Sequence, residues 1–120
     1  MSLGYIVSIP FGNNSRYDLI VDTDNNLYRV QVKYAHLNDN GSYTVPTSNI
    51  NNWGGKKIRK YYTKEDVDLL MTIIEDQLVV IPVEMINHSV SKIFRTGLPK
   101  YGTKSTCNLI SDFTIEKYLL

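Results

Sequence analysis

Short alternations of apolar and polar residues dominate the first half of the chain, and a period of two is typical of β-strands. Residues 5–9 form the first such run, and a turn-rich stretch follows them. Residues 17–22 and 27–35 are two further runs, joined by the turn-forming residues 23–26. The sequence therefore predicts a β-hairpin, with one strand before it and another after it at 42–46.

The middle of the chain holds two apolar runs, at 69–74 and 78–83. Residues 63–66 have the composition of a helix N-terminus. The two runs, however, are short and rich in β-branched residues, so a second hairpin is predicted. The Asn-rich stretch 49–55 is the best loop candidate. The remaining expected elements are a short helix near 83–86, a strand at 92–95 and a helix at 115–120.

The length of 120 residues and the hydrophobic fraction of 42% indicate one globular domain over residues 1–120. No apolar run approaches the roughly 18 residues of a membrane span, and the N-terminus lacks the pattern of a signal peptide. The single Cys107 excludes an internal disulfide framework and a zinc site built from clustered cysteines. These features predict a cytoplasmic protein in a reducing, intracellular setting, with no membrane partner.

Charge is segregated along the chain, although the net charge is only +1. Residues 40–64 contain five bases and no acid, residues 85–111 contain four bases and no acid, and the rest of the chain carries −8. Such segregation is typical of a surface that binds a charged partner. Short basic loops on a solvated surface give the same pattern, so the charge alone leaves both interpretations open.

The first predicted hairpin brings four polar side chains together. If its turn is centred on Asp24 and Asn25, the numbers of facing residues sum to 49, so Asp18 faces Gln31 and Arg16 faces Lys33. Directly opposed residues have β-carbons about 4.5–5.5 Å apart, and all four share one face of the hairpin. A slip of one residue would break this arrangement.

A carboxylate beside an amide oxygen is a ligand set that suits Mg²⁺, which keeps several of its waters. A neighbouring lysine can position or deprotonate a water molecule, or stabilise developing negative charge. Together these groups are the ones that metal-dependent phosphodiester hydrolysis requires. The alternative is an ordinary exposed polar sheet face with an Asp–Lys pair across the strands.

Three segments of the sequence resemble the PD-(D/E)XK endonuclease family: residues 5–12, 15–22 and 29–33. More narrowly, they resemble its Gln-x-Lys branch, which includes intron-encoded homing endonucleases. The likeness continues weakly over residues 62–86, where Asp68 stands in the place of a family aspartate before a pair of strands. The resemblance implies an α/β fold, with a restriction-endonuclease-like mixed central sheet and flanking helices.

The resemblance also implies roles for individual residues. Asp18 matches the metal-binding aspartate, Gln31 the position usually held by Asp or Glu, and Lys33 the catalytic lysine. The backbone carbonyl of Val32 would be a further metal ligand, and Arg16 would hold a phosphate. The implied cofactor is Mg²⁺, for which Mn²⁺ can substitute.

Double-stranded DNA is the partner that this family implies, and cutting both strands implies a homo-oligomer, either a dimer or a tetramer. The basic residues best suited to contact the DNA phosphates are Lys56, Lys57, Arg59 and Lys60. Their alternative role is that of a solvated basic loop.

Two departures from the family pattern favour a second hypothesis. Gln31 is neutral and attracts a cation less than a carboxylate does. The family also opens with a helix that carries a glutamate. We expect that helix to be absent here, because no Asp or Glu precedes Asp18. The alternative is therefore a catalytically silent or truncated module with the nuclease fold, which binds DNA or oligomerises. A third possibility is a small interaction protein with no role on DNA.

Overall fold

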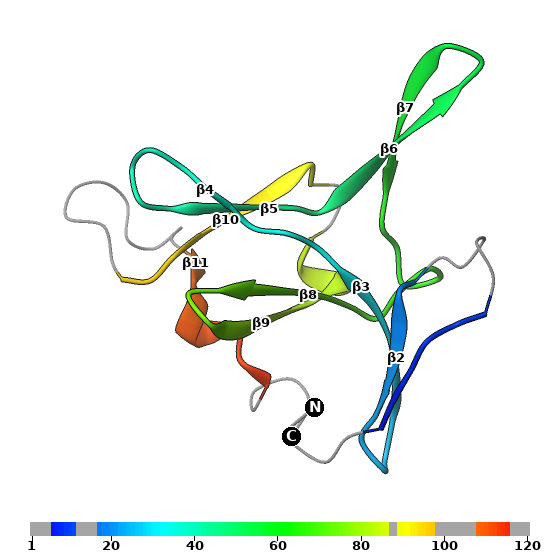
Figure 1. The fold of residues 1–120 in the computed structure, drawn as a ribbon, viewed down its shortest axis with the longest axis horizontal. Coiled ribbons are helices and arrows are strands. Elements are labelled where there is room, and N and C mark those ends of the chain that lie inside the picture. The colour runs from blue at the N-terminus through cyan, green and yellow to red at the C-terminus, as the bar shows by residue number, and fades with distance from the viewer. Residues whose placement is uncertain (1–5, 12–16, 87–88, 98–107, 116–120) are drawn as a thin grey trace.

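The computed structural model describes residues 6–11, 17–86, 89–97 and 108–115 (Figure 1). In chain order, the strands are Ile6–Ser8 (β1), Leu19–Asp22 (β2), Leu27–Val32 (β3), His36–Leu37 (β4), Tyr43–Pro46 (β5), Ser48–Trp53 (β6), Lys56–Tyr61 (β7), Leu69–Ile74 (β8), Gln77–Pro82 (β9), Ser91–Arg95 (β10) and Asn108–Leu109 (β11). Two short 3-10 helices, Val83–Met85 (η1) and Ile110–Asp112 (η3), are also described.

These strands form three sheets (Figure 1). The largest has the order β1-β2-β3-β8-β9, and its pairs are antiparallel except for the parallel pair of β3 with β8. A four-stranded sheet has the order β11-β10-β5-β4, and β6 pairs with β7 alone as a two-stranded ribbon. The expected mixed sheet is therefore present.

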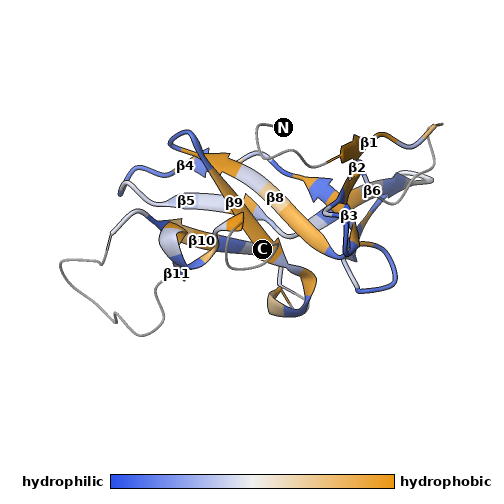
Figure 2. Ribbon diagram, turned by 90° about the horizontal axis from the view of Figure 1, so that it is seen from below, coloured by the Kyte–Doolittle hydropathy of each residue, from blue (hydrophilic) through white to orange (hydrophobic). Residues whose placement is uncertain are grey.

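The two larger sheets share a core that their apolar side chains fill. Figure 2 shows the largely hydrophobic strands β8 and β9 in the middle of the molecule. Leu70 and Ile81 are fully buried there and cluster with Phe94 of β10. The Phe94 ring packs edge-on against Phe113, with 5.1 Å between ring centroids. A second cluster, around Val21 and Val30, lies on the opposite face of the five-stranded sheet.

Both predicted hairpins are confirmed. Strands β2 and β3 pair as expected, and β8 and β9 pair through a tight turn at Glu75 and Asp76, whose φ angles are +51° and +64°. Positive φ at both central residues is what a two-residue hairpin turn of this kind requires. Residues 63–66 form a turn and no helix, because β8 begins only three residues later at Leu69.

Two expectations about local structure need correction. The Asn-rich stretch predicted as a loop is mostly strand β6, and only Gly54 and Gly55 form a turn, with φ of +55° and +84°. The flanking helices that the family resemblance implied are not confirmed, because the described ranges hold strands, short 3-10 helices and a single α-helical residue, Ile115. The predicted helix near 83–86 is the 3-10 helix η1, and the one at 115–120 lies almost entirely outside the described residues.

No helix of the described part of the chain has the length and apolar character needed to cross a membrane.

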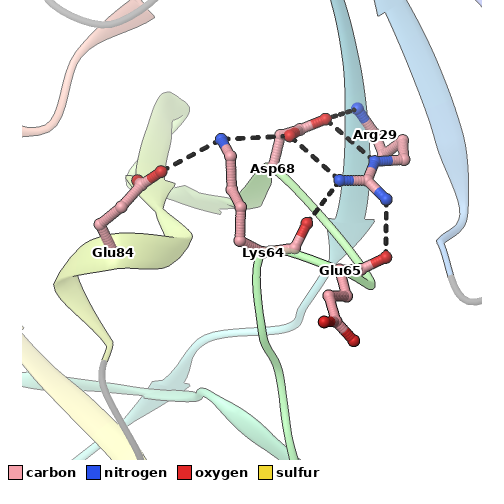
Figure 3. Close-up of polar contacts among 5 residues, drawn as sticks. All are labelled: Arg29, Lys64, Glu65, Asp68 and Glu84. Carbon is pink, nitrogen blue, oxygen red and sulfur yellow. Dashed lines mark hydrogen bonds and ion pairs between the residues drawn. The ribbon is translucent and has the colours of Figure 1, made fainter.

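Arg29 and Asp68 join β3 to the start of β8 (Figure 3). The backbone N–H of Arg29 donates to Asp68 Oδ2 at 2.8 Å, and Nε donates to the same oxygen at 3.2 Å. The Asp68 N–H donates in turn to the Arg29 carbonyl at 2.9 Å. The guanidinium also donates to the carbonyls of Lys64 at 2.6 Å and Glu65 at 2.7 Å. This clamp fixes the parallel register in which Val30 pairs with Leu69.

Lys64 extends the clamp toward the surface. Its Nζ lies 3.2 Å from Asp68 Oδ1 and 3.1 Å from Glu84 Oε1. Burial opposes ionisation of Asp68, but the hydrogen bonds from Arg29 and Lys64 outweigh it and leave the pKa of Asp68 below its ordinary value. The carboxylate is therefore charged in the folded protein at every pH near neutrality.

Replacing Asp68 with Asn should weaken the clamp. We expect the free energy of unfolding at pH 7 to fall by about 2 kcal/mol, because hydrogen bonds to charged groups contribute about 1.5–3 kcal/mol each. Urea unfolding followed by circular dichroism measures the change.

Glu84→Gln is the matched control, since Glu84 ends the same network with a side chain that is 59% exposed, and exposed ion pairs contribute little. The Asp68 contribution is present above about pH 4, where the unfolded aspartate is ionised, and is lost as the pH falls through the lower pKa of the folded state. Asp68→Asn should lack this loss in acid. Equal destabilisation by the two variants would contradict the importance of Asp68.

Candidate functional site

The β2–β3 pairing has the register predicted from the sequence. Leu19 pairs with Val30 and Asp22 with Leu27, so the numbers of facing residues sum to 49. The Asp18 N–H donates to the Val30 carbonyl at 2.8 Å, which continues the ladder one residue beyond the strand. This pairing brings Asp18 to Gln31, as predicted.

Asp18 accepts two hydrogen bonds from β3 on one oxygen. Gln31 Nε2 and the Val32 backbone N–H each donate to Asp18 Oδ2 at 2.9 Å. The other oxygen, Oδ1, accepts no hydrogen bond from the described residues, and the Asp18 side chain is exposed. One carboxylate oxygen is thus held in place by the protein, and the other is open to a ligand from solvent.

Lys33 follows directly after β3. Its backbone N–H donates to the Met71 carbonyl at 2.9 Å, which extends the parallel pairing with β8 to this residue. Its Nζ lies 4.9 Å from the centre of the Tyr62 ring, within the range of a cation–π interaction. The side chain is half-buried. This burial lowers the pKa of Lys33, and the negative charge of Asp18 partly opposes the shift.

Tyr62 is a residue of the site that sequence reasoning missed. Its side chain is buried in the core between the sheets, and its hydroxyl has no hydrogen-bond partner in the described part of the chain. Burial, together with the charges of Asp18 and Asp66, raises its pKa to about 12. The only sequence signal was the pair of tyrosines after the basic cluster, which did not indicate a contact with Lys33.

The remaining predicted residues lie elsewhere. Arg16 lies outside the described residues. The four bases predicted to contact DNA, Lys56, Lys57, Arg59 and Lys60, are exposed on β7 of the ribbon. Asp22 shares the strand face of Asp18 but accepts a hydrogen bond from the Asp24 N–H at 2.9 Å, so it caps the hairpin turn.

The model of the PD-(D/E)XK endonuclease family matches residues 1–116 of the chain. The chain belongs to the PD-(D/E)XK endonuclease family. No match was found among the curated proteins. Among solved structures, that of a bacterial homing endonuclease, I-Ssp6803I, is similar with a TM-score of 0.78 and 21% sequence identity, over 98% of this chain and 80% of that chain. The fold is therefore restriction-endonuclease-like, as the sequence resemblance implied.

The groups near Asp18 in this PD-(D/E)XK chain suit a hard cation, but they include few charges. An open carboxylate oxygen and a neighbouring side-chain amide are oxygen donors of the kind Mg²⁺ takes, and Mg²⁺ commonly uses one or two carboxylates and keeps several waters. Among the described residues, no three His, Cys, Asp or Glu side chains gather into one cluster. The donor set fits a weakly held Mg²⁺ and does not indicate a metal cage.

A hollow of about 600 Å³ lies beside this site and does not enclose it. Its lining includes Lys33 and Thr72 but neither Asp18 nor Gln31. Most of its other lining residues are apolar and belong to the face of the five-stranded sheet that carries Val21. The hollow is thus an apolar feature of the sheet, and the polar cluster at Asp18 is open to solvent.

The unpaired hydroxyl of Tyr62 gives a prediction about stability. Tyr62→Phe keeps the ring beneath Lys33 and removes a buried group without a partner, so the free energy of unfolding should rise by about 1 kcal/mol. NMR titration of the Lys33 side chain should give the same pKa as in the wild type. Tyr62→Leu, which removes the ring, should lower that pKa further, because the ring stabilises the ammonium. An unchanged Lys33 pKa in Tyr62→Leu would mean that the ring has no such effect.

Proposed function

We propose that this chain is a metal-dependent DNA endonuclease of the Gln-x-Lys branch, in which Asp18, Gln31 and Lys33 form the active site. The observation that carries the proposal is the register of β2 and β3, which brings these three side chains to one end of the hairpin beside an open carboxylate oxygen. Membership of an endonuclease family supplies the class of reaction.

Asp18 would hold Mg²⁺ through its open oxygen. The Gln31 amide, which here donates to Asp18, would present its oxygen to the ion after a half-turn, because an amide carries a donor and an acceptor on one carbon. The backbone carbonyl of Val32 would be the third ligand. When bound, Mg²⁺ supplies Lewis-acid stabilisation of the phosphate and lowers the pKa of a water molecule.

Lys33 would act as a cation at neutral pH. Asp18 and the Tyr62 ring both favour the charged ammonium, although burial weakens that preference. A positive charge held at this position stabilises the negative charge that develops on the phosphate in the transition state. The half-buried setting also reduces screening by water, so the charge acts more strongly than it would on the surface.

The exposed bases of β7, namely Lys56, Lys57, Arg59 and Lys60, would lie against the DNA, and Arg16 is a further predicted contact. Each such contact releases counterions, so the affinity for DNA should fall steeply with salt. Each chain supplies one site, and cutting both strands in a single binding event would require at least a dimer.

A catalytically silent DNA-binding module is the second candidate function. The observation that favours it is the single carboxylate at the site, since Gln31 contributes no charge. Such a module would retain salt-dependent DNA binding and show no cleavage and no Mn²⁺ binding at Asp18.

Supercoiled plasmid with Mg²⁺ or Mn²⁺ is the first substrate to test. We expect nicked or linear product from the wild type, and a loss of at least about 100-fold in rate for Asp18→Asn and for Lys33→Met. Asp22→Asn is the matched control, because Asp22 lies on the same strand face and caps a turn; it should cut at the wild-type rate. Cleavage that survives both Asp18→Asn and Lys33→Met would refute the proposed site, and absence of cleavage in the wild type with intact DNA binding would favour the silent module.

The lowered pKa of Lys33 predicts a pH dependence. If Lys33 acts as a cation, cleavage should decline as the pH rises through its pKa, and the midpoint should lie below the ordinary range of lysine and coincide with the midpoint of an NMR titration of Lys33. A rate that increases through that midpoint would show instead that the neutral amine takes a proton from water.

A further inference from the structure

The two-stranded ribbon of β6 and β7 stands apart from the rest of the fold. Figure 1 shows it extending away from the two larger sheets, and it forms hydrogen-bonded ladders with neither of them in the described part of the chain. Its six residue pairs span roughly 20 Å at about 3.3 Å per residue. A two-stranded antiparallel ribbon without a partner is only marginally stable in water, so an element of this length suggests an external binding partner.

The base of the ribbon is fixed firmly to the body. Thr47, just before β6, donates from its hydroxyl to the Ser89 carbonyl at 2.7 Å, and the Ser48 hydroxyl donates to the Val90 carbonyl at 3.1 Å. Arg59 Nη1 donates to the Ser48 hydroxyl at 2.7 Å. The outer part of the ribbon is therefore presented to solvent from an anchored base.

The two faces of the ribbon differ. One face carries Asn52 opposite Lys57 and Ile50 opposite Arg59. The side chains of the outer pair on this face, Asn52 and Lys57, make no hydrogen bond or ion pair with any described residue. This face is called the reading face below.

The opposite face carries Lys56, Ile58, Asn49 and Lys60. The side chains of its inner pair, Asn49 and Lys60, both have partners within the protein. Lys60 Nζ lies 3.7 Å from Asp66 Oδ1, and the Asn49 side chain accepts a hydrogen bond from the Ile50 N–H at 3.1 Å. The positive charge on this face is thus partly balanced by the protein itself.

We propose that the ribbon enters the major groove of double-stranded DNA and that its reading face, with Ile50, Asn52, Lys57 and Arg59, recognises base edges. The inference rests on the proposed action on DNA and identifies the ribbon as the element that determines which DNA sequences the protein prefers. The major groove, about 12 Å wide, admits a two-stranded β-ribbon. Asn pairs with adenine, Lys and Arg with guanine, and an apolar side chain contacts the thymine methyl group. Contacts with phosphates alone would not explain why this face also carries an uncharged amide, that of Asn52, opposite Lys57. They would also not explain the apolar Ile50, whose side chain is 50% exposed.

Lys56 and Lys57 provide a matched pair of variants. They are neighbours, both exposed and both singly charged, but they point to opposite faces of the ribbon. Binding through phosphates alone predicts equal effects of Lys56→Ala and Lys57→Ala, whereas recognition through the reading face predicts different effects.

The experiment is selection of bound duplexes from a library with a randomised central segment, in EDTA so that no DNA is cut. We expect the wild type to enrich a motif. Lys57→Ala and Asn52→Ala should each lose roughly fivefold or more of the preference at one or two positions of that motif. Lys56→Ala should keep the motif and bind all duplexes more weakly, with a salt slope reduced by about one. Asn52→Ala should keep the wild-type salt slope, because asparagine carries no charge.

Two results would overturn the inference: a wild type that enriches no motif, or equal loss of preference in Lys56→Ala and Lys57→Ala. Circular dichroism of each variant establishes that the fold is retained, as expected for exposed positions. A wild type that enriches a motif but cuts none of the enriched duplexes with Mg²⁺ would refute the proposed nuclease activity and still support the ribbon as the recognition element.

Discussion

The hydrogen-bonded ion pair between Arg29 and Asp68 is the constraint on which the site depends. It holds the start of β8 against β3 in one parallel register. In that register the backbone N–H of Lys33 donates to the Met71 carbonyl. The same guanidinium holds the carbonyls of Lys64 and Glu65. The turn that follows Tyr62 is thereby fixed, and with it the ring beneath Lys33. A contact outside the proposed site thus supports both of the segments that carry Lys33 and Tyr62.

The site is built at a cost to the stability of the fold. Lys33 is half-buried beside a core in which an apolar residue would pack more favourably, and Tyr62 buries a hydroxyl that no described residue satisfies. Proteins tend to violate the rules of stable packing where function requires it. Both violations occur at one end of β3, next to an open carboxylate oxygen, and together they support the proposed site more strongly than any single residue does.

Local features of the sequence predicted the local parts of this arrangement. The short turn after Asp22 fixed the register of the first hairpin and so the meeting of Asp18 with Gln31. The Asn-rich stretch before Gly54 was misread, because asparagine favours turns but here continues as a strand that has a partner across a two-glycine turn. The contact of Tyr62 with Lys33 depends on the parallel pairing of distant strands, which no local pattern specifies.

The charge segregation along the sequence has a spatial counterpart. The bases between residues 40 and 64 lie mostly on β7, whereas Asp66 and Asp68 lie just beyond the ribbon, where they bind Lys60 and Arg29. These acids partly balance the charges of Arg29 and of Lys60 at the base of the ribbon, and they leave the outer ribbon positive. Such a division separates two tasks that compete for the same residues. A rigid sheet would hold Lys33 in the proposed site, and an exposed ribbon would be free to meet the proposed DNA partner. A net charge near zero is therefore compatible with a strong local attraction for DNA, because association responds to the field around the ribbon and not to the sum over the chain.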